Sequence, residues 1–233
     1  MDSADWPVIA AGSAWTYGLN LAVSDLDVTS RSPHSGKGSS TALQLGLHTR
    51  YQALEDPRWF FSAHARVGRD EGKMKRSVAF ADYRGEQDSH WRGSSVNAGL
   101  MGAYLLPVAP SVSFGPVAGL DYVYAHRPGV KESGAPASNL ALSSLSADSL
   151  QSRLGVMAQG RWAVRAEQQL QAYLSVTWDH EWLDRYATQR VRLRASPQIA
   201  FDQRQAMGER DAMSLKAGMS FHPQDNVAVR ASV

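Results

Sequence analysis

The residues that most resemble a reactive group are Asp179, His180 and Glu181, which follow one another directly. Two carboxylates and an imidazole can hold a metal ion or transfer protons, provided that all three side chains converge on one point. The surrounding residues, 170–182, alternate between apolar and polar side chains, which indicates a β-strand. Successive side chains of a strand point to opposite faces, so His180 is predicted to face away from the two carboxylates. We therefore predict no catalytic site and no metal site here.

On such a strand the two carboxylates are expected to form ion pairs with a neighbouring strand. A residue on one strand packs against the residue opposite it on the next, so Asp179 and Glu181 are expected to pair with Arg153 or Arg161. His180 is expected beside Trp182 on the other face, near a membrane surface.

Other candidates for chemistry are weaker still. The seven histidines show no metalloprotease spacing, and the serine pairs at 39–40 and 94–95 lack the glycines of a nucleophile elbow. Residues 36–39 (GKGS) have the residue types of a phosphate loop without its spacing, and we expect a turn in an external loop there. Because cysteine is absent, disulfides and cysteinyl metal sites are excluded. No cofactor is predicted.

Composition narrows the class of protein. The 233 residues suffice for one large domain or two small ones, and the net charge is +2 with a pI near 8.9. Lys and Arg are not clustered, which argues against nucleic acid as a partner. No run of about 18 apolar residues exists, so no transmembrane helix is predicted. Residues 1–5 are acidic and polar, unlike a signal peptide, so a targeting region is expected to be missing from this sequence.

The strongest signal is a period of two, which is typical of strands with one polar face. Nine segments show it: 15–23, 41–51, 59–67, 96–106, 114–124, 150–164, 170–182, 213–221 and 227–233. The apolar face of these segments carries no Asp, Glu, Lys or Arg. The other face, followed to Arg165, carries ten charged residues: Arg50, Arg66, Asp121, Arg153, Arg161, Arg165, Asp179, Glu181, Lys216 and Arg230. Seven are basic and three acidic, which predicts a basic, water-filled interior.

A soluble sandwich also alternates, but three features favour a transmembrane barrel. Segments 150–164 and 170–182 exceed the usual soluble strand of about 5–6 residues and reach the length that spans a bilayer. Polar residues such as Arg153 and Arg161 would be costly in a dry core but can line a hydrated lumen. Connections also alternate between short (near 11–14, 53–57, 107–111, 166–168 and 223–226) and long (near 29–40, 71–90, 126–148 and 184–210), as periplasmic turns and external loops do.

Aromatic residues on the apolar face gather at the two ends of the predicted strands. In a membrane barrel such residues form girdles at the two interfaces, whereas in a soluble protein they would be ordinary core aromatics. The periplasmic girdle is predicted to contain Trp15, Tyr51, Trp59, Tyr104, Phe114, Trp162 and Phe221. The outer girdle is predicted to contain Tyr122, Tyr124, Trp178 and Trp182.

Four segments resemble the β-domain of autotransporters, the barrel of type V secretion. Residues 148–155 (DSLQSRLG) are similar to the family's DSLRSRLG strand, and they follow a loop whose residues 130–134 (VKESG) are similar to F-x-E-x-G. Residues 174–181 (LSVTWDHE) resemble the "lgWrHEf" strand, and 210–219 (RDAMSLKAGM) resemble RDALLLGAGL. The order and spacing of these segments make the resemblance extend over essentially the whole chain.

The resemblance implies an all-β, antiparallel up-and-down transmembrane barrel of twelve strands with a helix through the pore. Nine strands and a stub at 8–10 are counted here, so residues 1–233 are expected to form an incomplete barrel domain. The helix, the first strand, most of the second and the last are expected to be missing. Because open sheet edges are not tolerated in lipid, we expect that this chain would not insert alone.

The resemblance also implies a function. The domain is expected in the outer membrane of a Gram-negative bacterium, as a monomer that anchors an N-terminal passenger and assists its export without catalysis. Its expected partners are the lipid bilayer with its lipopolysaccharide, the passenger polypeptide and the outer-membrane assembly machinery. Two alternatives remain open: a porin-like channel or surface adhesin whose long loops bind ligands, and an outer-membrane hydrolase that uses external-loop carboxylates.

Overall fold

The computed structural model describes residues 15–30, 35–52, 58–165, 168–224 and 227–232, with a few side chains in these ranges left undescribed. Most of this backbone is strand. The long strands are β1 (Trp15–Ser30), β2 (Ser35–Gln52), β3 (Trp59–Phe80), β4 (Tyr83–Tyr104), β6 (Val112–Arg127), β10 (Leu145–Arg165), β11 (Gln168–Glu181) and β14 (Asp211–Gln224). The short elements are β5 (Leu106–Ala109), β7 (Val130–Lys131), β8 (Ser133–Gly134), η1 (Pro136–Ser138), β9 (Leu140–Leu142), β12 (Tyr186–Leu193), β13 (Ala200–Ala206) and β15 (Val227–Ser232).

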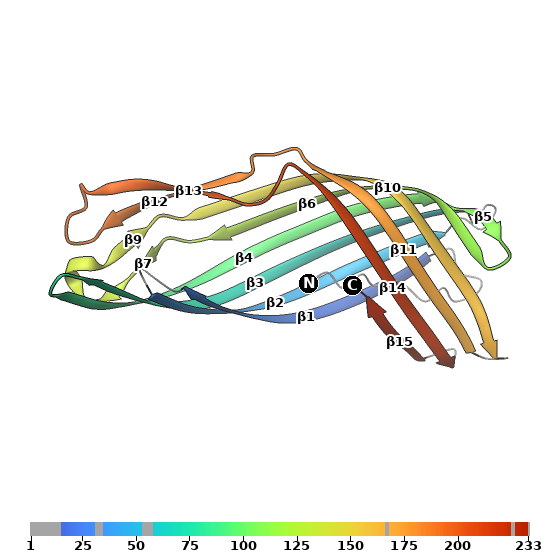
Figure 1. The fold of residues 1–233 in the computed structure, drawn as a ribbon, viewed down its shortest axis with the longest axis horizontal. Coiled ribbons are helices and arrows are strands. Elements are labelled where there is room, and N and C mark those ends of the chain that lie inside the picture. Colours follow the sequence, from blue (N-terminus) through green and yellow to red (C-terminus); the bar gives the residue numbers. More distant parts are fainter. Residues whose placement is uncertain (1–14, 31–34, 53–57, 166–167, 225–226, 233) are drawn as a thin grey trace.

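The long strands form one antiparallel sheet in the order β1-β2-β3-β4-β6-β10-β11-β14-β15. The sheet curls, so that β10, β11 and β14 cross over the ends of β1 and β2 in Figure 1. Neighbours in the sheet are joined in chain order, with β5 added beside β6 and β8 beside β4. The predicted all-β, antiparallel up-and-down barrel architecture is confirmed, here as a half-barrel. The predicted stub at 8–10 lies outside the described residues.

The apolar face of the sheet points outward, away from the inside of the curl. Registers align Leu21 with Leu45, Leu45 with Val67, and Val67 with Val96, so one row of apolar side chains crosses four strands. These side chains are exposed: Leu21 is 68% exposed and Leu45 is 54% exposed. No second layer packs on them in the described part of the chain, so they do not form the dry core of a sandwich.

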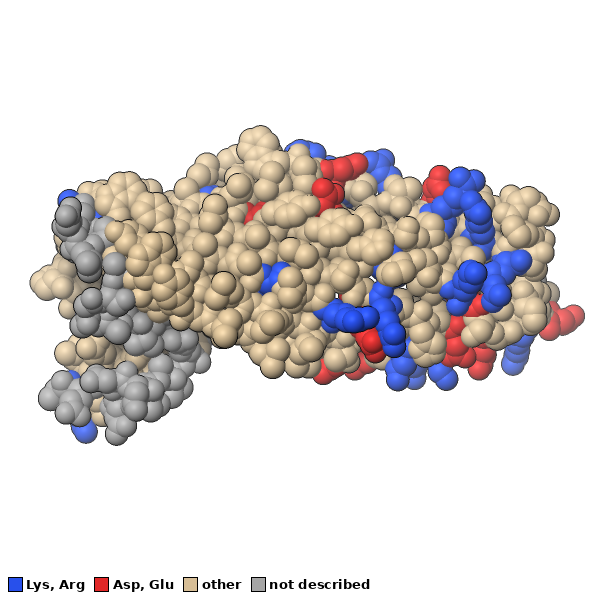
Figure 2. Space-filling view, turned by 180° about the vertical axis from the view of Figure 1, so that it is seen from behind, with Lys and Arg blue, Asp and Glu red and all other residues tan. Residues whose placement is uncertain are grey.

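Charge is distributed unevenly along the long axis of the molecule. In Figure 2 the part of the face toward the β5 end shows few Lys, Arg, Asp and Glu, and these residues occur from the middle of the molecule to the end that carries β7 and β9 in Figure 1. A broad surface of exposed Leu, Val and Trp is unfavourable in water and favourable against hydrocarbon. The strands therefore have the surface of a lipid-facing wall with one polar extremity.

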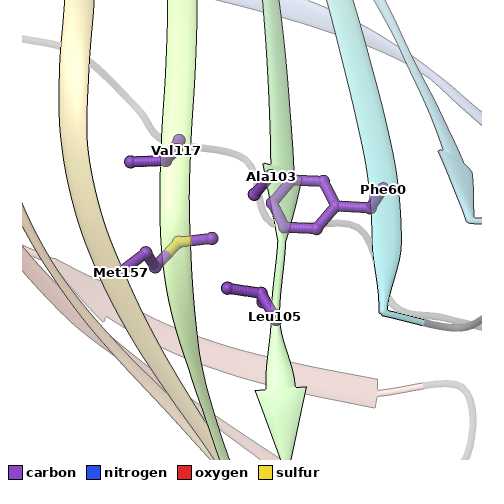
Figure 3. Close-up of a cluster of buried hydrophobic side chains, with 5 residues drawn as sticks. All are labelled: Phe60, Ala103, Leu105, Val117 and Met157. Carbon is purple, nitrogen blue, oxygen red and sulfur yellow. The ribbon is translucent and has the colours of Figure 1, made fainter.

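A small apolar cluster lies inside the curl, toward the β5 end. Phe60, Ala103, Leu105, Val117 and Met157 are each at most 4% exposed. Figure 3 shows them converging from β3, β4, β6, β10 and, for Leu105, the link between β4 and β5. The Arg50 guanidinium lies over the Phe60 ring, 4.6 Å from its centroid. The alternation pattern did not reveal this cluster, since it counted charge on the inward face and not the apolar residues between the charges.

The strands extend much further than the alternation predicted, and this corrects the long loops. The segment 71–90 is almost entirely the paired ends of β3 and β4, joined at Ala81, whose φ is +48°. The segment 29–40 is strand at both ends, so the predicted turn at residues 36–39 is wrong: Gly36 to Ser39 pair with β3. Outside lipid both faces of a hairpin can be polar, so the backbone continues as strand while the period of two disappears.

Two further predicted loops also contain strands. Within 126–148 lie β7, β8, η1 and β9, and within 184–210 lie β12 and β13. Four of these strands form a separate sheet in the order β13-β12-β9-β7 at one end of the molecule, as Figure 1 shows. Among the described residues, no helix is long and apolar enough to cross a membrane.

Candidate functional site

The predicted inward-facing charges meet most closely around Arg153 on β10. Its Nε lies 3.0 Å from Asp179 Oδ1 on β11, and its Nη1 lies 3.3 Å from Asp121 Oδ2 on β6. Register explains both contacts, because Arg153 stands directly opposite Asp179, and Asp121 is opposite its neighbour Gln151. One guanidinium thus links carboxylates on the strands at either side of it.

The chain of contacts continues in both directions from these three residues. Asp179 accepts hydrogen bonds from Thr177 and from Ser214 on β14, at 3.1 and 2.6 Å. On the other side, His64 Nε2 lies 3.6 Å from Asp121 Oδ1. His64, Asp121, Arg153, Asp179 and Ser214 are called the inner charge network below. It extends over six neighbouring strands, from β3 to β14.

A glycine makes the contact between His64 and Asp121 possible. These residues stand on β3 and β6, which are separated by β4, and the β4 residue between them is Gly99. A Cβ at Gly99 would overlap both the Asp121 carboxylate and the His64 ring. The missing side chain therefore lets two groups approach across an intervening strand.

Three other predicted inward charges line a cavity of about 510 Å³ that also contains Asp121 and Arg153. They are Arg50, Arg66 and Lys216, from β2, β3 and β14. Polar uncharged residues such as Ser175 and Gln44 share this lining. The curl thus brings strands from both halves of the sheet around one polar interior space.

The remaining predicted inward charges are more dispersed. Arg161 lines a separate cavity of about 400 Å³ near β5, with Gln159 and Gln171. Arg165 is exposed at the end of β10, beyond a register shift between Ala163 and Arg165. The side chain of Arg230 lies outside the described residues.

The predicted pairing of Glu181 with Arg153 or Arg161 is wrong. It does not contact Arg153 or Arg161, because the register places Gln151 opposite it. Its carboxylate instead accepts hydrogen bonds from Ser149 Oγ at 2.5 Å and from the backbone amides of Leu150 and Leu183, at 3.0 and 2.9 Å. Glu181 therefore fastens the outer ends of β10 and β11 to the connection that follows.

His180 points to the opposite face from Asp179 and Glu181. Its Nδ1 lies 2.7 Å from Asp211 Oδ1, and its ring packs edge-on against Trp182 at 4.7 Å. The three residues therefore do not converge, as a metal or proton-transfer site would require. In the described part of the chain, no group of three His, Cys, Asp or Glu side chains is arranged to hold a metal ion.

The aromatic residues predicted for the girdles lie on the outward face. At the β5 end, Trp15 packs against Tyr51 at 4.8 Å, and Trp59 packs against Tyr104 at 4.6 Å. At the other end, Trp178 donates a hydrogen bond from Nε1 to Asp211. The others are exposed or half-buried on the same face: Phe114, Tyr122, Tyr124, Trp162, Trp182 and Phe221.

A second ion pair, at the charged end, was missed by the sequence analysis. Glu132 is 7% exposed, and Arg76 on β3 holds its carboxylate with two bonds, at 3.0 and 2.6 Å. The Leu140 amide donates to the same carboxylate at 2.8 Å, and Arg194 donates to the Glu132 carbonyl oxygen. Arg76, Glu132 and Arg194 are called the outer clamp, since they join β3, the 130–142 segment and the end of β12.

The glycine two residues after Glu132 belongs to the same arrangement. Gly134 has φ +116° and pairs with Gln87 on β4. A Cβ there would overlap the Glu86 carbonyl oxygen. The signal that could have revealed this site was the spacing of Glu132 and Gly134, which the sequence analysis noted only as part of a motif.

Comparison with known proteins decides which barrel this is. The family described as Autotransporter beta-domain matches residues 3–233, nearly the whole chain. The chain belongs to the autotransporter β-domain family. The predicted resemblance is thereby confirmed, and so is the location in the outer membrane of Gram-negative bacteria, where the barrels of this family reside.

A solved structure supports the same assignment of fold. The autotransporter β-domain described here is similar to the translocator domain of the autotransporter NalP from Neisseria meningitidis, with a TM-score of 0.58 and 15% identity. The match covers 95% of this chain and 74% of that one. A search of the curated proteins finds no match. This likeness supports the barrel fold of an autotransporter β-domain.

Proposed function

We propose that this autotransporter β-domain anchors a passenger in the outer membrane and provides a hydrated path along which the passenger is exported. The main support is the difference between the two faces of the same strands. The inward face offers Asp121 and Arg153 around a cavity, with Asp179 paired to Arg153 beside it, and the outward face of the described strands offers only uncharged side chains between its ends.

The inward face suits an extended polypeptide in transit. A chain without secondary structure has unpaired backbone N–H and C=O groups, which are costly to remove from water. A cavity lined by Ser175, Gln44 and charged side chains offers substitute hydrogen-bond partners and has room for water. The carboxylates of the inner charge network are already paired with Arg153, so they form a polar wall and not a reactive site. Catalysis is not part of this proposal.

Blocking the cavity tests the proposal with two adjacent residues. Ser175 lines the cavity, and Val176 is the next residue on β11 and faces outward. In the domain fused to a protease-sensitive reporter, Ser175→Trp should delay the appearance of the reporter at the cell surface. Val176→Trp should leave export at the wild-type rate, because its indole faces lipid.

A gel that compares heated and unheated samples would show that both variants are folded. Export at the wild-type rate in folded Ser175→Trp would contradict the proposal. A steady conductance of the wild-type domain in planar bilayers would favour the porin-like channel instead, and retention of a soluble ligand by the external segments would favour the adhesin.

A further inference from the structure

The cavity of about 510 Å³ inside the curl has more positive than negative charge in its lining. Asp121 supplies the one carboxylate among the described lining residues. The two histidines of the lining, His48 and His64, add no negative charge. Four lining residues are basic: Arg50, Arg66, Arg153 and Lys216.

Two of these four basic residues are held by other groups. The Arg153 guanidinium lies between Asp121 and Asp179, at 3.3 and 3.0 Å, so its charge is compensated. Arg50 is 5% exposed, and its guanidinium lies over the Phe60 ring. Neither side chain is therefore the main source of the positive charge that the open part of the cavity presents.

Arg66 and Lys216 are not compensated in this way. Among the described residues, neither has a carboxylate at ion-pair distance, and the buried Arg66 Nε has no hydrogen-bond partner. The next inward carboxylate along β3 is Asp70, whose oxygens lie over Gly93 on β4. Two positive charges in the cavity are thus left without a counter-charge.

The two residues reach the cavity from the two sides of the curl. Arg66 is on β3 and Lys216 is on β14, and four strands separate β3 from β14 in the sheet. Both side chains nevertheless line one space, because the sheet curls round it. An extended chain that enters this space therefore has a basic residue on either side.

Electrostatics predicts what these charges do to such a chain. A narrow space with one sign of charge and low-dielectric walls concentrates the opposite charge. Even with the dielectric constant of water, a charge at about 4 Å from one of these residues is favoured or disfavoured about fivefold, according to its sign. An attraction of this size aids entry and is weak enough to let the chain leave.

We propose that Arg66 and Lys216 select passenger segments by charge, so that acidic stretches cross the barrel faster than basic ones. This inference rests on the proposed export path, because it requires the passenger to enter the cavity. Carboxylates of the passenger meet the two uncompensated charges, whereas its lysines and arginines are repelled. The substrate class of the path is thereby an extended polypeptide that is rich in Asp and Glu.

The test uses the full domain, fused to the protease-sensitive reporter through a short segment of alternating Ser and Asp, Ser and Asn, or Ser and Lys. In wild type, the acidic segment should carry the reporter to the cell surface about fivefold faster than the basic segment. Arg66→Gln with Lys216→Gln should make the two rates nearly equal. A gel that compares heated and unheated samples shows that each variant is folded.

Two further variants separate charge from structure. Arg66→Lys with Lys216→Arg changes the shape of both side chains and keeps their charge, so it should keep the wild-type ratio of rates. Lys73→Gln with Lys75→Gln also removes two positive charges, but from exposed positions on β3 that share the outward face of Val67. This variant should keep the wild-type ratio as well.

Equal rates for the acidic and basic segments in wild type would overturn the proposal. A ratio that Arg66→Gln with Lys216→Gln leaves unchanged would overturn it too, as would an equal fall in the ratio with Lys73→Gln and Lys75→Gln. The neutral segment separates this inference from the proposed function. If Ser175→Trp delays the neutral segment while wild type exports all three segments at one rate, the export path stands and selection by charge is refuted.

Discussion

The inner charge network and the outer clamp each contain an arginine that holds a buried carboxylate, but they are built differently. Arg153 and Asp179 stand opposite each other on adjacent strands, inside the lipid-spanning part of the sheet. Arg76 and Glu132 are 56 residues apart and join a strand to a short folded segment beyond it. The pair of Arg153 and Asp179 follows from strand register. The pair of Arg76 and Glu132 requires a particular fold of the connection between β6 and β10.

This difference shows how contact with lipid restricts the residue types along a strand. Where lipid covers one face, every second residue must be apolar, so register and partners can be read from a period of two. Where water covers both faces, that constraint disappears, and stability depends on a few specific contacts. The outer clamp is therefore expected to be more sensitive to single substitutions than the inner charge network. In that network a residue that loses one partner keeps another.

The largest expected effect comes from removing the carboxylate of the outer clamp. Glu132→Ala leaves the Arg76 guanidinium and the Leu140 amide without their acceptor, and breaking a buried pair in this way costs about 3 kcal/mol. The external segments should open, and trypsin should cleave after Lys131 and Arg194 faster than in wild type. The control is Glu209→Ala, whose ion pair with Arg185 is exposed and should contribute under about 1 kcal/mol. Equal trypsin sensitivity of the two variants would refute the role of the clamp.

A smaller effect is expected in the inner charge network. Asp179→Ala removes the acceptor of Arg153, Thr177 and Ser214, but Arg153 keeps Asp121 and can be hydrated. We expect a loss of about 2 kcal/mol in the free energy of unfolding, measured by urea titration in lipid vesicles. Asp202→Ala, on the exposed strand β13, should change it by less than about 0.5 kcal/mol. If Asp179→Ala were more damaging than Glu132→Ala, the proposed contrast between the two regions would be reversed.

The smallest of the three effects concerns a glycine in the outer region. Gly134→Ala must place a Cβ against the Glu86 carbonyl oxygen at a φ of +116°, which costs about 1–2 kcal/mol. Gly208→Ala is the matched control, because nothing lies within 4 Å of a Cβ there. The readout is again the rate of trypsin cleavage after Lys131. A wild-type rate in Gly134→Ala would show that β8 does not need its pairing with β4.

The lipid-facing strands could be predicted from the sequence, and the region beyond the membrane mostly could not. The nine strands of the main sheet and their faces could be derived from alternation, because lipid contact is a constraint on every residue of those segments. The same pattern limited the partner of Asp179 to Arg153 or Arg161, and the register then selected Arg153.

The extension of β3 and β4 through residues 71–90 could not be derived, since charged side chains occur on both faces of this hairpin, as the adjacent Lys75 and Arg76 show. The partner of Glu132 could not be found either, because a contact across 56 residues leaves no local pattern.

The inward apolar cluster and Glu181 show a second limit. The cluster around Phe60 and Met157 arises from the curvature of the sheet, which brings β3 and β10 together, and curvature is not visible in a period of two. Glu181 was assigned an arginine partner from its charge, but register placed it beside Ser149 and backbone amides. Alternation predicted its face, but its charge did not predict its contacts.

The central claim is that lipid contacts every second side chain of these strands. The chain has no cysteine, so a single nitroxide label can be attached at Leu45 or at Gln44, which are adjacent and face opposite ways. In the membrane-inserted protein, paramagnetic resonance should show the label at position 45 accessible to oxygen and shielded from a water-soluble nickel chelate. The label at position 44 should show the reverse. The same accessibility at both positions, or the opposite order, would contradict the account.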